Sequence, residues 1–382
     1  AVEKVRTGAR ASFADTISGV DLIVGARSGG VQLLLYSVFR IGNATNNISW
    51  KTYRELQQHP RIAWTVPISL GDSHAGYRVI GTTPAFYQHY QYADRRSLGF
   101  AQGSPFDDVF DVVLGSQVAS KLGYRIGDRI VLAHGAGPVS LIKHEDKPFR
   151  VVGILAPSGT PVDRSLQVDL RGIEAIHKDW FSGSPIPGVR FDAERVRNMD
   201  LTPKTITAFL VGLNSKVSTF RVQREINTYP EEPLLAVLPG AALAELWELM
   251  GVAENALLVI SAMVVLVGLA GMLTVLLTSL NERRREMAIL RSIGARPWQI
   301  FSLVVGEASV ISLAGMLGGL LLLYLGMVGL SPWLASEFNL FIGLGPPGLR
   351  ELALMLLVWI CGTLVGLVPA RAAYRNSLAD GL

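Results

Sequence analysis

The sequence contains a single cysteine, Cys361, which lies within an apolar run. One cysteine excludes a disulfide framework within the chain and a zinc site built from cysteines. Charged residues are also scarce, at 17% of 382 residues, where a water-soluble domain has about 25%. The deficit is local, because residues 1–254 hold 27 Lys and Arg and 25 Asp and Glu, whereas residues 255–382 hold only 8 and 6. The composition predicts a water-soluble first part and a membrane-embedded last third.

Motifs for catalysis are missing as well. The sequence has no Walker A motif, no G-x-S-x-G nucleophile elbow and no H-E-x-x-H. The nearest approach to Walker A is Gly25–Gly30 (GARSGG), which lacks the Lys-Ser/Thr pair, and we interpret it as a glycine turn after the apolar strand Leu22–Val24. No basic cluster lies outside the last third, so the net charge of +4 does not indicate nucleic acid binding. We therefore predict that the chain is not itself an enzyme.

Three long runs without charge lie in the last third, at Asn255–Leu280, Ala308–Ser336 and Leu352–Ala370. A helix rises about 1.5 Å per residue, so the first run reaches about 39 Å and crosses a hydrocarbon core of about 30 Å with some tilt. The second run is broken near its end by Ser331-Pro332, and the third is just long enough to span. The sequence therefore predicts three transmembrane helices.

The placement of arginines predicts the orientation of these helices. The arginines that separate the first two runs or follow the third are Arg283, Arg284, Arg285, Arg291, Arg296, Arg371 and Arg375. Only Arg350 lies between the second and third runs. The positive-inside rule puts the arginine-rich connection and the C-terminus in the cytoplasm and residues 1–254 outside. Because the residues after Ala1 lack the apolar core of a signal peptide, we expect a further span ahead of Ala1, four in all.

Residues 1–254 combine short β-type runs with helical stretches. The expected strands are Tyr77–Gly81, Asp111–Leu114, Arg129–Ala133, Phe149–Leu155 and Ala208–Leu213. The expected helices are Trp50–Gln58, Gln117–Leu122, Leu170–Asp179 and Lys216–Thr228. Strands and helices mixed without a strict βαβ rhythm favour an α+β domain outside the membrane.

The stretch Ala241–Ala253 leads into the first apolar run. It places Leu243, Leu246, Trp247 and Met250 on one helical face, with Glu245 and Glu248 opposite. Two interpretations stay open. The stretch is an amphipathic stalk at the membrane surface, where tryptophan is favoured, or a helix that packs against the soluble domain.

All six histidines lie in the soluble part, and they are His59, His74, His89, His134, His144 and His177. His134, His144 and Asp146 would approach one another across a hairpin, which would permit a metal site and a metal-linked binding module. Scattered surface histidines are the commoner explanation. We therefore predict no metal site and no cofactor bound by this chain.

The most informative segment is Asn281–Phe301 (NERRREMAILRSIGARPWQIF). Met287, Leu290 and Ile293 make an apolar stripe beside a charged face, Gly294 stands where a C-terminal cap needs positive φ, and Pro297 suits the first turn of the next helix. The pattern predicts a helix, a sharp turn and a helix at the cytoplasmic face. A solvated loop would not need such a stripe, so a partner protein is expected to cover it.

Two features of the apolar runs bear on packing and gating. Glu307 lies about one turn into the start of the second span, where it is hydrated or paired with Arg296, or acts in gating. Gly315-x-x-x-Gly319 and Gly362-x-x-x-Gly366 have the spacing that lets two helices approach closely, which gives weak support for oligomerisation.

The segment Glu282–Ala295 (ERRREMAILRSIGA), followed by Glu307, closely resembles the signature of the FtsX-like permease family, the membrane subunits of MacB-type bacterial ABC transporters. Further segments resemble that family's early strand, its MacB-like periplasmic core domain and its exit from the last span. They are Asp21–Gly25 (DLIVG), Asp111–Asp128 (DVVLGSQVASKLGYRIGD), Phe149–Gly159 (FRVVGILAPSG) and Pro369–Arg375 (PARAAYR). The resemblance covers nearly the whole chain.

The resemblance implies a multi-pass subunit of the bacterial inner membrane that pairs with a second permease subunit, identical or not. A separate cytosolic ATPase, which holds ATP and Mg²⁺, would dock on the loop after the first span seen here. The resemblance makes Glu286, Met287, Leu290, Ile293 and Gly294 the candidate ATPase contacts. ATP-driven movement would then reach the periplasmic domain by mechanotransmission and move or release a lipoprotein, peptide, antibiotic or other amphipathic molecule.

The predicted organisation has eight segments. They are a MacB-like periplasmic domain (1–239), an amphipathic stalk (240–254), a transmembrane helix (255–281), a coupling segment (282–297), a transmembrane helix (300–330), a periplasmic loop (331–351), a transmembrane helix (352–371) and a cytoplasmic tail (372–382). Membrane lipids and a periplasmic adaptor or chaperone complete the expected partners. The alternative function is a signalling module, resembling the cell-division members, that activates a cell-wall hydrolase without transport.

Overall fold

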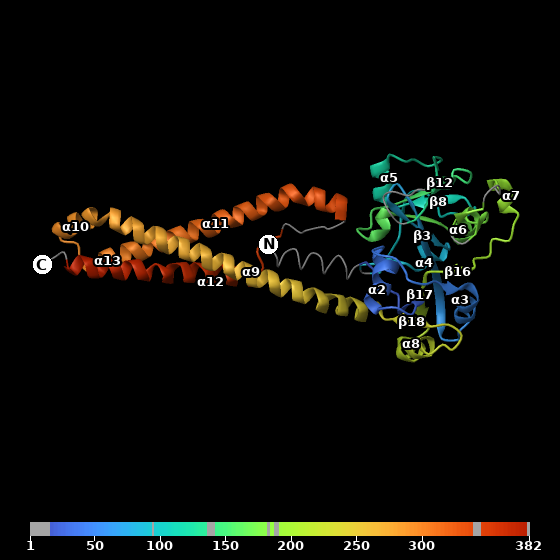
Figure 1. The fold of residues 1–382 in the computed structure, drawn as a ribbon, viewed down its shortest axis with the longest axis horizontal. Coiled ribbons are helices and arrows are strands. Elements are labelled where there is room, and N and C mark those ends of the chain that lie inside the picture. Colours follow the sequence, from blue (N-terminus) through green and yellow to red (C-terminus); the bar gives the residue numbers. More distant parts are fainter. Residues whose placement is uncertain are drawn as a thin grey trace. The chain divides into compact units, whose positions relative to one another are not determined.

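A computed structural model describes residues 16–93, 95–135, 142–181, 184–186, 191–338 and 345–379. The chain divides into two compact units, one with the described residues up to Leu249 and the other with those from Met250. The first unit mixes strands and helices, and the second is helical (Figure 1). The predicted combination of an α+β domain with apolar helices is confirmed.

The main strands of the first unit form a mixed sheet in the order β18-β1-β17-β3-β4-β13-β8-β12-β7. Their bounds are β1 Leu22–Ala26, β3 Ile62–His74, β4 Tyr77–Thr82, β7 Phe100–Gly103, β8 Asp111–Leu114, β12 Phe149–Leu155, β13 Ser165–Asp169, β17 Ala208–Leu213 and β18 Leu234–Val237. Strand β13 pairs in parallel with β4, and β12 with β8, while the other neighbours are antiparallel.

The long strand β3 joins the two halves of this sheet. Its residues from Ile62 to Ile68 pair with β17, and those from Ser69 to His74 pair with β4, with a shift of register after Leu70. The last residues also pair with β10, Ala133–His134, which in turn pairs with β11, Ile142–Lys143. The sequence pattern does not indicate β3, because Pro67 and Gly71 are residues that normally interrupt a strand.

Helices cover both halves of the sheet (Figure 1). Their bounds are α2 Gly30–Leu34, α3 Trp50–Gln57, α4 Ala85–His89, α5 Ser116–Leu122, α6 Leu170–Ile176, α7 Ala193–Arg197 and α8 Thr219–Asn227, with a π-helical turn at Leu35–Phe39 after α2. The largest buried cluster contains residues of both halves, and each half also has a smaller one, shown by Phe149 in one and Phe209 in the other. Both rings are fully buried and make edge contacts to a second ring. Truncating either to alanine would cost about 3–5 kcal/mol.

Most predicted strands are found where they were expected. The strands at Asp111–Leu114, Phe149–Leu155 and Ala208–Leu213 have the predicted bounds. The strand predicted at Arg129–Ala133 is instead two short strands, β9 (Arg129–Ile130) and β10. The reason is tertiary, since β9 pairs with β12 and β10 pairs with β3.

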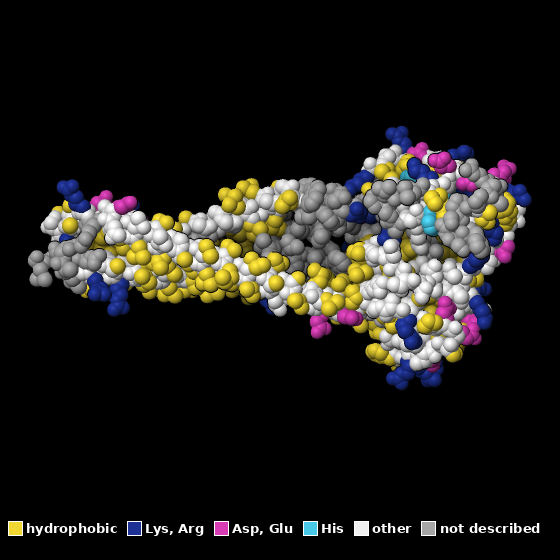
Figure 2. All heavy atoms as spheres, in the orientation of Figure 1, with side chains coloured by type: hydrophobic (Ala, Val, Ile, Leu, Met, Phe, Trp, Pro, Cys, Tyr) yellow, Lys and Arg dark blue, Asp and Glu magenta, His cyan; other side chains and the backbone are white. Residues whose placement is uncertain are grey.

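Helix α9, Pro239–Glu282, begins in the first unit and continues into the second, which also contains α10 Arg284–Ser292, α11 Pro297–Phe338, α12 Leu349–Val365 and α13 Leu367–Ala379. Three stretches are long and apolar enough to cross a membrane: Pro239–Glu282, Pro297–Leu330 and Leu349–Arg375. Apolar side chains cover their visible surfaces (Figure 2), and Val264 and Leu322 are 65% and 71% exposed. Such surfaces are stable only in lipid or against a partner, and the three long apolar helices that the sequence predicts are found in the structure.

One helix bound differs from expectation, and the packing at the start of α9 bears on a question that the sequence left open. Helix α11 continues through Ser331 and Pro332 to Phe338, where the sequence suggested a break and a loop. A proline removes only one backbone donor, and a membrane helix tolerates that loss. At the start of α9, Ala242 is buried and Leu243 is half-buried against the core of the first unit. The interpretation of this stretch as a packed helix therefore holds for its first turn.

Candidate functional site

The predicted coupling segment folds as helix α10 followed by a tight turn. Gly294 has φ of +100°, and its N–H donates to the Arg291 carbonyl at 3.0 Å. The N–H of Ala295 donates to the Leu290 carbonyl, also at 3.0 Å. These two bonds form a Schellman cap, and Pro297 begins α11. The predicted sequence of helix, glycine turn and helix is therefore confirmed.

The residues of the predicted apolar stripe have two different environments, one packed and one exposed. Met287 packs against a buried cluster from α11 and α13 that consists of Ile300, Val304, Ala370 and Ala373. Leu290 and Ile293, by contrast, are 39% and 77% exposed, and Ile289 beside them is 56% exposed. Glu286 and Gly294 are exposed too. Met287 thus holds the segment to its own unit, while the other candidate contacts remain available to a partner. Ile289 is a further exposed apolar residue of this surface, and it was not among the predicted contacts.

Glu307 forms an ion pair with Arg283, whose Nη1 lies 3.2 Å from Glu307 Oε1. The sequence analysis considered Arg296 as the partner, and this detail was wrong. Arg283 stands between α9 and α10. The pair therefore ties α11 to the start of the connection Arg283–Arg296 between α9 and α11, which we call the elbow.

The two glycine pairs of the spans have different environments. A side chain at Gly362 would collide with Ser312, and one at Gly366 would collide with Ala308, both on α11. Gly315 and Gly319 have no atom within 4 Å of the place where a side chain would begin. The pair on α12 therefore serves packing within the chain, and its spacing gives no support for oligomerisation.

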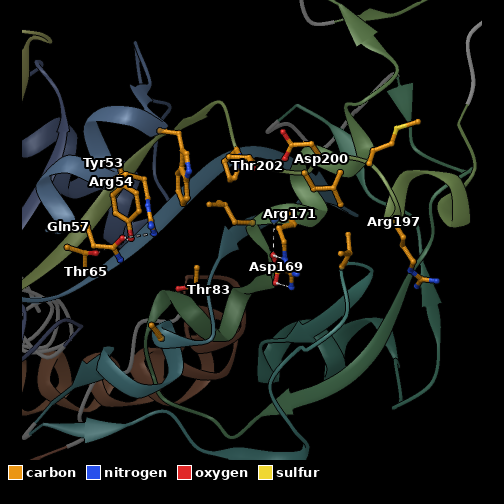
Figure 3. Close-up of a pocket in the computed structure, with 17 residues that line it drawn as sticks. Tyr53, Arg54, Gln57, Thr65, Thr83, Asp169, Arg171, Arg197, Asp200 and Thr202 are labelled. Atoms are coloured by element: carbon orange, nitrogen blue, oxygen red, sulfur yellow. Dashed lines mark hydrogen bonds and ion pairs between the residues drawn. The ribbon is translucent and has the colours of Figure 1, made fainter.

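A cleft of about 740 Å³ opens in the first unit beside α3 and α6 (Figure 3). Its three arginines are all engaged. Arg171 makes a two-pronged contact with Asp169 at 2.7 and 3.0 Å, Arg54 binds Gln57 at 3.0 Å, and Arg197 binds the carboxylate of Asp108 at 2.8 Å. Arg171 and Arg197 are therefore paired with carboxylates, whereas Arg54 bonds only the neutral amide of Gln57.

A cluster of titratable side chains lies elsewhere in the first unit. Asp72 on β3 and His134 on β10 are directly opposed in the strand register. His144 follows β11, and His177 caps the C-terminus of α6. Hydrogen-bonding atoms of these four residues all lie within 4.8 Å of one another.

The cluster shifts the pKa values of its members. Burial would raise the pKa of Asp72, but hydrogen bonds from His134 and His177 outweigh it and lower the pKa to about 2. Burial also lowers the pKa of His144 to about 4, aided by the charge of His177. Burial acts in the same direction on His177, yet the hydrogen bond to Asp72 and its charge raise that pKa above the ordinary value.

Sequence analysis found half of this cluster. It paired His134 and His144 with Asp146, but Asp146 is exposed and binds Lys147 at 2.8 Å. Asp72 and His177 take its place. Neither was detectable, because Asp72 lies on the strand that sequence analysis missed and His177 is distant in sequence from the hairpin.

The structure thus combines an α+β domain with three long apolar helices, two of which are linked by an arginine-rich connection. A model of the MacB-like periplasmic core domain matches residues 5–229, and a model of the FtsX-like permease C-terminal region matches residues 258–378. The chain therefore belongs to the FtsX-like permease family with a MacB-like periplasmic core domain.

Characterised relatives are similar over part of their length. The chain is 26% identical over 290 residues to the pyoverdine export ATP-binding/permease protein PvdT of Pseudomonas syringae pv. tomato, covering 72% of this chain and 39% of that protein. It is 27% identical over 213 residues to the macrolide export ATP-binding/permease protein MacB of Escherichia coli strain K12, covering 50% of this chain and 31% of that protein. The chain thus spans well under half the length of these relatives.

Solved structures of related domains are more distant. The periplasmic region of MacB from Actinobacillus actinomycetemcomitans matches with a TM-score of 0.36 and 12% identity, covering 60% of this chain and 94% of that one. The extracellular domain of the ABC-type transporter YknZ from Gram-positive bacteria matches with a TM-score of 0.33 and 11% identity, covering 57% and 98%.

Proposed function

We propose that this chain is the permease subunit of a MacB-type exporter of the bacterial inner membrane, driven by a separate cytosolic ATPase that docks on the elbow of α10. The observation that carries the proposal is the exposure of Leu290 and Ile293 on a rigidly capped helix between two membrane spans. Exposed apolar side chains on a charged helix are costly in water and are stabilised by a partner surface.

The distribution of arginines supports a cytoplasmic location for this elbow. Arg283, Arg285, Arg291 and Arg296 lie in the connection between α9 and α11, and Arg371 and Arg375 lie in α13, which packs beside α10. Dark-blue side chains gather at this end of the helical unit (Figure 2). Arg350, at the start of α12, marks the opposite end. The positive-inside rule then assigns the MacB-like core domain to the periplasm.

The coupling would be mechanical, with movement of the ATPase transmitted through the helices. ATP and Mg²⁺ stay on the ATPase, whose dimerisation pushes on Leu290 and Ile293. Met287, packed against α11 and α13, and the ion pair of Arg283 with Glu307 would pass the movement to the spans. Helix α9, unbroken from Pro239 to Glu282, would carry it toward the periplasmic domain. A second permease subunit and a periplasmic adaptor or chaperone would complete the assembly, and the substrate would be an amphipathic molecule released on the periplasmic side.

The match to the MacB-like core domain over residues 5–229 favours this exporter over a signalling module that activates a cell-wall hydrolase. The exporter proposal depends on the docking of the ATPase, and this step can be tested directly.

The test is a double variant, Leu290→Asp with Ile293→Asp, expressed with the ATPase in the native host. We expect the permease to insert at the wild-type level but to lose co-purification of the ATPase. The matched control is Val217→Asp with Phe220→Asp, because these apolar side chains of the first unit are 93% and 72% exposed. The control should retain the ATPase. Full recovery of the ATPase with the elbow variant would overturn the assignment.

A further inference from the structure

Asp72, His134, His144 and His177 offer one carboxylate and three imidazoles to a single point in the first unit. Three separate parts of the chain supply them: strand β3, the β10–β11 hairpin with the residue that follows it, and the end of α6. The α10 elbow and its proposed role do not involve these residues. Their chemistry is that of a metal site, because imidazole and carboxylate are common ligands of zinc.

The spacing of the ligand atoms fits a tetrahedral ion. His134 Nδ1 lies 3.0 Å from His177 Nε2 and 3.3 Å from Asp72 Oδ1, and His177 Nε2 lies 3.5 Å from the same carboxylate oxygen. Zinc bonds of about 2.0–2.1 Å at tetrahedral angles separate neighbouring ligand atoms by about 3.3–3.4 Å. Three ligand atoms therefore already stand at the distances that such an ion requires.

The orientation of His177 suits metal binding. Its Nδ1 lies 2.9 Å from the Ile173 carbonyl oxygen, which only accepts, so Nδ1 carries a proton. A bound metal ion would displace the proton that Nε2 shares with Asp72, and Nε2 would then present a lone pair to the ion. A histidine that binds a metal typically donates its other N–H to a backbone carbonyl in this way.

His144 supplies the independent observation. It is only 2% exposed, and its Nε2 is buried with no hydrogen-bond partner. A buried polar atom left without a partner costs about 1–3 kcal/mol. A metal ion held by the other three side chains would satisfy this nitrogen and remove that cost.

Charge and enclosure select the kind of ion. Three imidazoles suit zinc and its neighbours among the transition metals rather than Mg²⁺ or Ca²⁺, which prefer oxygen ligands. The buried Lys147 nearby is paired with Asp179 at 2.8 Å and with Asp146 at 2.8 Å. A divalent cation and the positive charge of Lys147 would together balance the negative charges of Asp72, Asp146 and Asp179. The Trp180 ring lies against His134, His144 and His177, with centroids 4.8–5.0 Å apart, and shields one side.

We propose that Asp72, His134, His144 and His177 bind one Zn²⁺ ion in the domain outside the membrane. Four protein ligands leave no open coordination position, so the ion holds the β10–β11 hairpin, β3 and α6 together and does not act as a catalyst. The site would make the shape of this half of the domain dependent on zinc supply.

The test uses the full chain, purified in detergent through a tag without histidines and stripped of metal. Titration against a zinc-buffering dye should give about one Zn²⁺ per chain. Co²⁺ in place of Zn²⁺ should show the intense visible bands of tetrahedral coordination. His144→Ala should weaken zinc binding by more than about 100-fold, because loss of an outer-shell partner alone costs 10–100-fold. Asp72→Asn, which keeps the side-chain shape, should weaken it as well.

His89→Ala is the matched control, since His89 lies in the same unit but stacks on Trp64. It should bind zinc like the wild type. Circular dichroism of each metal-free variant checks that it is folded. If His144→Ala is not folded, Asp72→Asn is the ligand variant whose zinc affinity is compared with the wild type. A wild-type chain that binds no zinc, or folded ligand variants that bind it as tightly as the wild type, would overturn the proposal.

Discussion

Arg283 and Glu307 form an ion pair of 3.2 Å that joins the end of the first span to the second. Their side chains are 52% and 33% exposed, so solvent screens the pair only in part. The pair sits beside the elbow, and its removal would loosen the connection that the coupling proposal requires.

Charge reversal at this pair should show coupling between the two residues. Arg283→Glu or Glu307→Arg alone places like charges together and should lower the melting temperature of the permease in detergent. The double reversal should recover part of the loss, with a coupling energy of about 1 kcal/mol. Additive losses in the double-mutant cycle would show that the contact contributes nothing.

Gly294→Ala should destabilise the elbow by about 1–2 kcal/mol, because a side chain is strained at positive φ. Faster proteolysis after α10 and weaker stimulation of the ATPase are the measurements. Gly251→Ala is the control, since Gly251 lies inside α9 in open space and alanine favours a helix there. Equal behaviour of the two variants would contradict the role assigned to the cap.

Gly366→Val should disrupt the packing of the last span, because its side chain would meet Ala308 of α11. Overpacking costs about 1–3 kcal/mol, and contact near the backbone leaves little room to relax. Gly315→Val should be tolerated, since that position is open. Thermal stability in detergent compares the two, and a stable Gly366→Val variant would show that the helices do not pack as described.

Asp179→Ala should cost the first unit about 3–5 kcal/mol, because Lys147 is 1% exposed and would be left as a buried charge without its main partner. Asp146→Ala removes a carboxylate that is 33% exposed and should cost less than about 1 kcal/mol. Denaturant unfolding of both variants measures the difference. Similar losses of stability in the two variants would mean that burial does not decide which ion pair of Lys147 is the stronger.

Zinc should raise the melting temperature of the first unit. At a free concentration of 100 times Kd, the ion adds about 2.7 kcal/mol, which for a unit of this size corresponds to about 5–10 °C. Chelation should reverse the shift, and Asp72→Asn should show little of it. Differential scanning of the purified chain makes the comparison, and equal shifts in wild type and Asp72→Asn would point to zinc binding elsewhere.

The elements that sequence analysis found are those whose signal is local. The strand at Phe149–Leu155 and the cap at Gly294 follow from a few neighbouring residues, as do the three spans. Strand β3 was missed because Pro67 and Gly71 hide its pattern, and only its pairing with β17 and β4 keeps it extended. Met287 was grouped with Leu290 because periodicity places residues on a face without saying what covers that face.

The sequence by itself determined the division into a soluble and an apolar part, the number of spans and the arginine-rich elbow. These depend on composition and on short-range periodicity, which the chain carries before it folds. Only the tertiary structure decided that Glu307 faces Arg283 and that Asp72 meets three histidines. Those contacts depend on how β3, β10, α6 and the spans pack, because each joins residues that chain connectivity leaves far apart.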